Sequence, residues 1–125
     1  MSTDESQSQY FSPGAFVLVT LGNPREKFWG ALLQLRPAGL TLRGIDLNSF
    51  DDFADMVRSG EPTNATTVFF PMHRVERVEI DSPSGSIPSL AGRFASKTGR
   101  DAADCLGIEE QDLFLPPSGA RGEPR

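Results

Sequence analysis

Short apolar runs separated by turn residues shape the first half of the chain. The runs cover residues 16–21, 27–35 and 40–47, and the turns between them fall at residues 22–24 and 37–39. Runs of this length that contain many valine, leucine and aromatic residues and end at glycine or proline are typical of β-strands. The pattern therefore predicts three consecutive strands joined by tight turns.

A further β-rich stretch covers residues 67–81. Its end alternates, so that Val75, Val78 and Ile80 are available to a core while the charged side chains largely face outward. Together the two stretches predict five short strands. The expected fold class is mainly β, in the form of a small five-stranded barrel.

Two pairs of adjacent aromatic residues lie on the predicted strands. Phe28 precedes Trp29, and Phe69 precedes Phe70. Because successive side chains of a strand point to opposite faces, one member of each pair is expected outside the core. An outward aromatic side chain can line a subunit interface or stack on a base.

A short helix is predicted between the third and fourth strands, within residues 48–60. Asn48 or Ser49 can cap it, and Ser59-Gly60 ends it before a proline. Its apolar residues follow the i, i+3, i+4, i+7 spacing of one helix face: Phe50, Phe53, Ala54 and Val57. The opposite face carries aspartates and is expected to be solvated; a metal site there would lack a nearby His or Cys ligand.

A second helical pattern begins at Ser89, a favourable capping residue. Gly99 fits better as a break than as an interior residue, which predicts helices near 89–97 and 101–106. We expect their apolar residues to pack against the barrel or a partner chain. A helix-turn-helix is the alternative, although Asp101 and Asp104 stand where a recognition helix would present cations or amides.

The length of 125 residues predicts one domain with tails. The expected parts are a disordered acidic leader at 1–13, the barrel at 14–82, a helical extension at 83–115 and a flexible tail at 116–125. A barrel of this size is near the small end of what folds alone, so oligomerisation would help it.

Net charge argues against unspecific binding of phosphates. The chain has 12 Lys and Arg against 17 Asp and Glu, a formal charge of −5. Most of this acidity lies outside the predicted strands, in the inserted helix and the terminal segments. A nucleic-acid role would therefore require a local basic patch.

The sequence also limits the cellular compartment and the chemistry that are expected of the protein. A single cysteine, Cys105, excludes an internal disulfide framework, and no apolar run approaches the roughly 20 residues of a membrane span. The N-terminus lacks signal-peptide features, so a cytoplasmic protein is expected. The only histidine, His73, has no nucleophile motif or phosphate loop beside it. We expect no enzyme, no cofactor and no metal site.

Several short elements of the chain form a recognisable pattern: Phe28-x-Gly30-x-Leu32, Gly39-Leu40-x-Leu42 and residues 17–23 and 73–78. In this pattern, about half of the chain resembles the Sm-like family, including its bacterial RNA-chaperone branch. The resemblance implies a strongly bent SH3-like barrel in which Gly30 lets the second strand bend sharply. It also implies that a variable excursion separates the third and fourth strands, where residues 48–60 fall, and that the last two strands join neighbouring subunits in a ring.

The resemblance implies a candidate site for single-stranded RNA at His73 and Arg74, with Arg36 or Arg43 nearby. The histidine corresponds to that of a lysine-histidine pair in the bacterial branch. Where family members typically have an acidic residue followed by an asparagine, this chain has Arg36 and Gly39.

Two functions are therefore expected. The first is an Sm-like protein that binds single-stranded RNA as an oligomeric ring. The alternative is an acidic protein-interaction or assembly module with no nucleic-acid ligand. In both cases another copy of the chain is an expected partner and a membrane is not, and a salt-dependent affinity for RNA would distinguish them.

Overall fold

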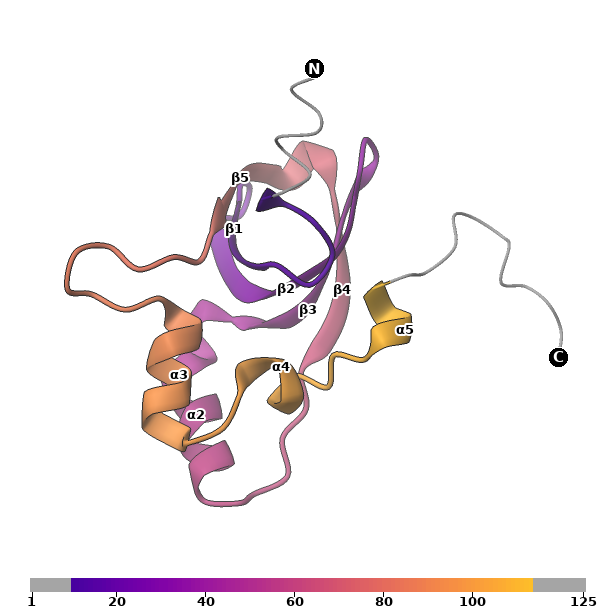
Figure 1. Ribbon diagram of the computed structural model, residues 1–125. Coiled ribbons are helices and arrows are strands. Elements are labelled where there is room, and N and C mark those ends of the chain that lie inside the picture. Colours follow the sequence, from indigo (N-terminus) through magenta and orange to yellow (C-terminus); the bar gives the residue numbers. More distant parts are fainter. Residues whose placement is uncertain (1–9, 114–125) are drawn as a thin grey trace, which may run out of the picture.

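The computed structural model describes residues 10–113 (Figure 1). Most of the predicted leader and the whole predicted tail at 116–125 lie outside these residues. Phe11, near the end of the predicted leader, packs against the apolar residues of the sheet interior.

The described residues form one five-stranded antiparallel sheet with short helices, which confirms the predicted mainly-β class. The strands follow in the order β4-β3-β2-β1-β5, so β4 and β5 are the two edges and the sheet is not closed by hydrogen bonds. The barrel form stays a prediction. The strand bounds are β1 Phe16–Leu21, β2 Glu26–Arg36, β3 Gly39–Asp46, β4 Thr66–Pro71 and β5 Val75–Ile80.

The sheet curls because one short connection contacts both ends of its longest strand. The 3-10 turn η2, Met72–Arg74, joins β4 to β5. The N–H of Met72 donates to the carbonyl of Ala38 at 2.9 Å, and the N–H of Gly22 donates to the carbonyl of Arg74 at 2.8 Å. Ala38 and Gly22 lie in the turns at opposite ends of β2. The strand must therefore bend strongly, as Figure 1 shows.

A glycine pair lets β2 and β3 approach closely within this bend. Gly30 lies opposite Gly44 in the register of the two strands. A Cβ atom on Gly30 would lie 2.3 Å from the Arg43 carbonyl oxygen, and one on Gly44 would lie 2.1 Å from the Trp29 carbonyl oxygen. Since these neighbours are backbone atoms, no side chain is accommodated without moving the strands.

The concave face of the sheet holds an aliphatic core, which we call the interior cluster. Its fully buried members are Val17, Val19, Leu21, Leu32, Leu40 and Leu42. Val75, Val78 and Ile80 pack against it, as predicted. The pairing of β1 with β5 shifts register between Thr20 and Leu21, and this irregularity brings Val75 and Val78 to one face although they are an odd number of residues apart.

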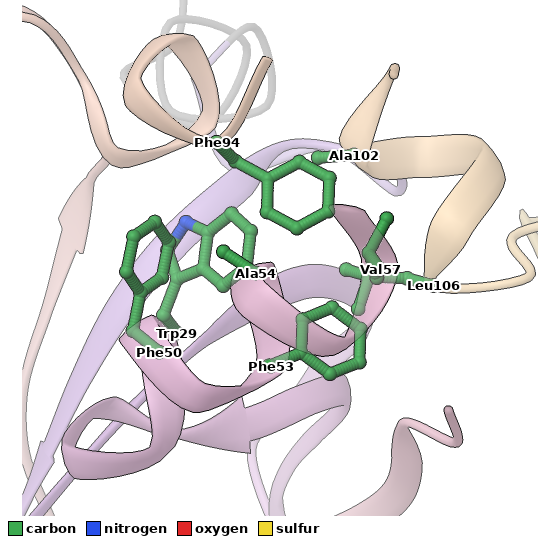
Figure 2. Close-up of a cluster of buried hydrophobic side chains, with 8 residues drawn as sticks. All are labelled: Trp29, Phe50, Phe53, Ala54, Val57, Phe94, Ala102 and Leu106. Carbon is green, nitrogen blue, oxygen red and sulfur yellow. The ribbon is translucent and has the colours of Figure 1, made fainter. Parts of the chain in front are cut away.

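Helices cover the opposite face of the sheet. They are the 3-10 turn η1 Leu47–Ser49 and the helices α2 Phe50–Arg58, α3 Leu90–Thr98, α4 Ala102–Cys105 and α5 Glu110–Leu113. Their apolar side chains and Trp29 form a second core, the helical-layer cluster (Figure 2): Trp29, Phe50, Phe53, Ala54, Val57, Phe94, Ala102 and Leu106. The predicted helix within 48–60 and the predicted packing of Phe94 and Leu106 are confirmed.

One expectation about the strand aromatics is wrong. Of Phe28 and Trp29, one was expected outside the core, yet Trp29 is fully buried and Phe28 packs against the interior cluster. The reason is that α2 and α3 cover the outer face of β2, so both faces are buried there. Phe69 and Phe70 follow the expectation: Phe70 packs inward and Phe69 is 55% exposed on an edge strand.

The ends of α3 agree with the predicted cap and break. The Ser89 hydroxyl accepts from the N–H of Gly92 at 2.9 Å, and Gly99 has a φ of 74°, a left-handed conformation that favours glycine. The short helix α4 buries Ala102, and Leu106 behind it is also buried. Its apolar side faces the core, which does not fit a recognition helix.

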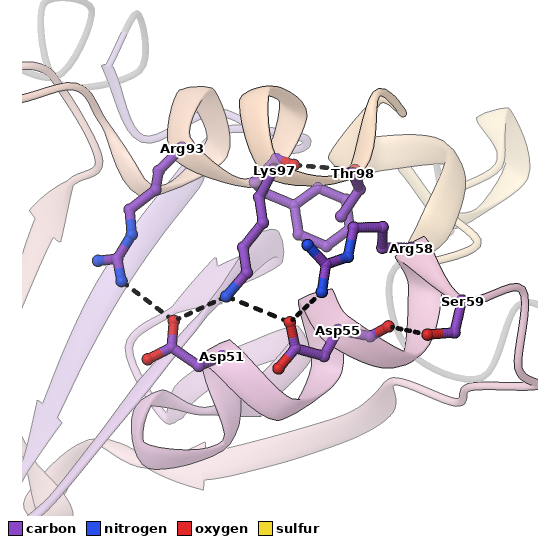
Figure 3. Close-up of polar contacts among 8 residues, drawn as sticks. Asp51, Asp55, Arg58, Ser59, Arg93, Lys97 and Thr98 are labelled. Carbon is purple, nitrogen blue, oxygen red and sulfur yellow. Dashed lines mark hydrogen bonds and ion pairs between the residues drawn. The ribbon is translucent and has the colours of Figure 1, made fainter.

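Ion pairs connect the outer faces of α2 and α3 (Figure 3). Asp51 accepts from Arg93 at 3.0 Å, and Lys97 lies 3.6 Å from Asp51 and 3.4 Å from Asp55. The predicted solvated face of α2 therefore also contacts α3. The carboxylates are half-exposed or more, so each pair stabilises the fold by less than about 1 kcal/mol.

Asp81, directly after β5, joins the sheet to the helical layer. Its carboxylate accepts from the indole N–H of Trp29 at 3.1 Å and from the backbone N–H groups of Leu90 at 2.7 Å and Ala91 at 2.9 Å. The last two groups are unpaired N–H donors of the first turn of α3. One carboxylate thus fixes both the start of α3 and the orientation of the buried indole.

Candidate functional site

The structure places the four predicted RNA-binding residues in two regions. His73 and Arg74 lie in η2, and Arg36 ends β2 beside the turn whose Ala38 carbonyl accepts from η2. His73 and Arg36 are therefore at the same end of the sheet. Both are exposed, and the only hydrogen bond described for the Arg36 side chain goes to the Gln34 Oε1 atom at 3.3 Å.

Arg74 is already engaged by the turn between β1 and β2. Its Nη2 atom donates to the carbonyl of Pro24 and to the Glu26 carboxylate, both at 3.1 Å. Its Nε atom is buried and has no hydrogen-bond partner among the described residues. In this conformation Arg74 holds the turn against η2, and the positive charge of its guanidinium is paired with the Glu26 carboxylate.

Arg43 lies apart from η2, on the outer face of β3, and is fully engaged within the chain. Its Nε atom donates to the Thr67 hydroxyl, and its Nη1 atom to the carbonyl of Gly107 at 2.9 Å. Its Nη2 atom pairs with the Asp112 carboxylate at 3.3 Å. The guanidinium therefore ties the segment after α4 to the sheet, and it would have to release these partners to contact a phosphate.

The two edge strands form a second candidate site. Within residues 10–113, β4 pairs only with β3 and β5 only with β1, so each presents one unpaired row of backbone groups. Phe69 is the large apolar side chain on the outer face of β4, and its ring covers Gly39: a Cβ atom there would lie 2.6 Å from Phe69 Cζ. Unpaired strand edges readily pair with another chain.

A pocket of about 660 Å³ lies where the two cores meet. It is formed by the start of β2, the end of β3, α2 and the beginning of β4, and it opens to solvent. No sequence pattern predicted this pocket. The pocket is built from four separate segments, and no spacing along the chain could have indicated that they converge.

Asp81 is a residue whose structural role the sequence did not reveal. It ends the stretch 67–81, in which the charged side chains were expected largely to face outward. Asp81 precedes Leu90 by only nine residues, but that spacing does not indicate a contact. Only the fold shows that α3 begins beside the Asp81 carboxylate.

Across residues 10–113, no group of three His, Cys, Asp or Glu side chains is arranged to hold a metal ion. Among the same residues, no helix has the length and apolar character needed to cross a membrane.

Comparison of the chain with protein-family models, with curated proteins and with solved structures gives no match. The resemblance to the Sm-like family therefore stays a prediction from the residues of this chain.

Proposed function

We propose that this protein is an Sm-like assembly module whose copies join through the free edges of β4 and β5. The observation that carries the proposal is the strand order β4-β3-β2-β1-β5 with η2 between the two edges. In a curled sheet of this order the edges lie on either side of one short turn. The bend of β2 and the Gly30–Gly44 contact support the Sm-like, SH3-like barrel form.

The two edges differ, which favours assembly in a ring over a symmetric dimer. Strand β4 carries the exposed Phe69, whereas β5 carries the exposed ion pair of Arg77 with Glu79 at 2.6 Å. A contact between unlike edges is heterologous, and such contacts repeat until the rotation closes. Assembly would also bury an exposed aromatic side chain on a small fold.

The test is the absolute mass in solution, measured by size exclusion with light scattering at two concentrations. The parent chain is expected to form a discrete assembly above a dimer. Phe69→Lys, which places a charge on the edge strand, is expected to shift the mass toward the monomer. The matched control is Ile87→Lys, the same type of change at a side chain that is 67% exposed and lies outside the sheet.

A parent chain that is monomeric at both concentrations would contradict the proposal. So would two lysine variants that lower the mass equally, because the effect would then come from added charge in general.

Binding of single-stranded RNA at the η2 end is the second candidate function. The observation that favours it is the joint exposure of His73 and Arg36 at one end of the sheet, with Arg74 beside them in η2. A ring would repeat this pair once per subunit. Arg43 would contribute only after releasing its internal partners.

Fluorescence anisotropy with a labelled single-stranded RNA oligonucleotide at two salt concentrations tests this candidate. Replacing both His73 and Arg36 with Ala is expected to lower the affinity about tenfold and to flatten its salt dependence. The control is Arg100→Ala, which removes an exposed arginine at the far end of α3. Unchanged binding by the double variant would exclude this site.

A further inference from the structure

The pocket at the meeting of the two cores has apolar walls. Phe28 and Val68 pack against the interior cluster, while Ile45 and Phe53 belong to the helical layer, and all four line the pocket. Met56 adds a flexible thioether to the wall on α2. A volume of about 660 Å³ is within the range of pockets that hold small molecules.

The charged side chains that line the pocket are all acidic. Asp46 and Asp52 line it, and no lysine, arginine or histidine does. Asp52 takes part in no ion pair or hydrogen bond described within residues 10–113, whereas its neighbour Asp51 is paired with Arg93 and Lys97. Asp46 uses one carboxylate oxygen, Oδ1, to accept from the N–H of Asn48 at 2.8 Å. Asp46 also borders a neighbouring hollow that Arg25 and Lys27 line, but neither Asp46 nor Asp52 has an ion pair described within residues 10–113. The pocket therefore presents two carboxylates without an ion-pair partner.

Neutral polar groups complete the pocket. Ser49, Asn64 and Thr66 line it, and none of their side chains has a hydrogen bond described within residues 10–113. Apolar walls with a few convergent polar groups are typical of sites that bind and orient a small ligand. Uncompensated carboxylates attract cations and repel carboxylate or phosphate ligands.

We infer that this pocket binds a small amphiphilic cation, that is, an aromatic or aliphatic body carrying one ammonium group. The body would lie against Phe28, Phe53 and Val68, and the ammonium would contact Asp46 and Asp52. A charge-assisted hydrogen bond to a carboxylate is stronger than a neutral one, so the charge determines which ligands are selected. This inference does not depend on the proposed assembly.

The experiment is a titration of the ¹⁵N-labelled full chain, followed by NMR through the backbone amides of the pocket residues. The probes are 2-phenylethylamine and hexylamine, both cations at neutral pH, with neutral 2-phenylethanol and anionic 3-phenylpropanoate for comparison. At least one amine is expected to shift the amides of Phe53, Thr66 and Val68. The alcohol is expected to bind about fivefold more weakly than 2-phenylethylamine, and the anion not measurably.

Asp52→Asn is expected to weaken amine binding about threefold, the size of an exposed charge pair. Asp46→Asn, which keeps an oxygen to accept from Asn48, is expected to have a similar or larger effect. The matched control is Asp51→Asn, the same change one residue away on α2, in a side chain that contacts α3 and not the pocket. Its amine affinity is expected to equal that of the parent.

Three results would overturn the inference: no amine shifts the pocket amides at millimolar concentration, the alcohol binds as tightly as the amines, or Asp51→Asn weakens binding as much as Asp52→Asn. The titration is repeated on Phe69→Lys. Equal affinity there would show that the pocket acts within one chain, whatever the outcome of the assembly test.

Discussion

The two faces of the sheet are buried in different ways. The interior cluster is aliphatic and comes mainly from neighbouring strands joined by short turns. The helical-layer cluster contains four aromatic rings beside aliphatic residues and combines β2 with segments as far along the chain as Leu106. Its rings pack edge to face, stacked or tilted, with Trp29 5.1 Å from Phe50 and Phe53 5.8 Å from Phe94 between centroids. The comparison teaches that the helices after β5 belong to the fold and are not an appendage.

The largest loss of stability is expected from removing the ring of Phe94, which lies at the centre of the helical-layer cluster. Phe94 is fully buried and contacts the rings of Trp29, Phe50 and Phe53. Phe94→Ala is expected to lower the free energy of unfolding by about 4 kcal/mol, measured by urea denaturation, because it removes a large side chain and leaves a cavity. Phe69→Ala, at an exposed phenylalanine, is expected to cost less than about 1 kcal/mol.

The Phe94→Ala variant also tests whether the two faces of the sheet unfold separately. Hydrogen exchange of Phe94→Ala should show faster exchange in α2 and α3 than in β1 and β2. Uniform acceleration over the whole chain would show instead that the two cores form one cooperative unit.

An intermediate loss of stability is expected at Asp81, whose carboxylate connects the sheet to the helical layer. Asp81→Ala removes the acceptor of three hydrogen bonds, including two from the first turn of α3. We expect a loss of about 2–3 kcal/mol in the free energy of unfolding and a change in Trp29 fluorescence. Glu79→Ala, two residues earlier on β5 and in an exposed ion pair, is the control and should change stability by less than about 1 kcal/mol. Equal losses for the two variants would contradict the role given to Asp81.

The smallest effect is expected at the surface of the helical layer. Asp51→Asn disrupts the contacts with Arg93 and Lys97, yet Asp51 is 62% exposed, so the loss should stay below about 1 kcal/mol. Denaturation at low and high salt measures it, and the difference from the parent chain should shrink as salt rises. A loss as large as that of Asp81→Ala would mean that the ion pairs, rather than the aromatic core, hold α3 in place.

Local patterns predicted the elements of this fold well. Alternation and turn residues indicated the strands, the i, i+3, i+4 spacing of Phe50, Phe53 and Ala54 indicated α2, and Ser89 and Gly99 marked the ends of α3. The candidate RNA site was harder to predict. Sequence proximity grouped His73 with Arg74, but Arg74 and Arg43 are held by partners 24 or more residues away that no local pattern identifies.

The sequence by itself determined which residues form strands and helices, because these choices depend on local propensity, turn chemistry and the period of the apolar positions. Only the tertiary structure decided that Trp29 is buried, that Asp81 connects two layers and that four segments form an open pocket with apolar walls and two aspartates. Each of these depends on which surfaces meet after the chain folds. The physical reason is that burial and charge compensation are properties of neighbours in space, and the spacing of residues along the chain does not specify those neighbours.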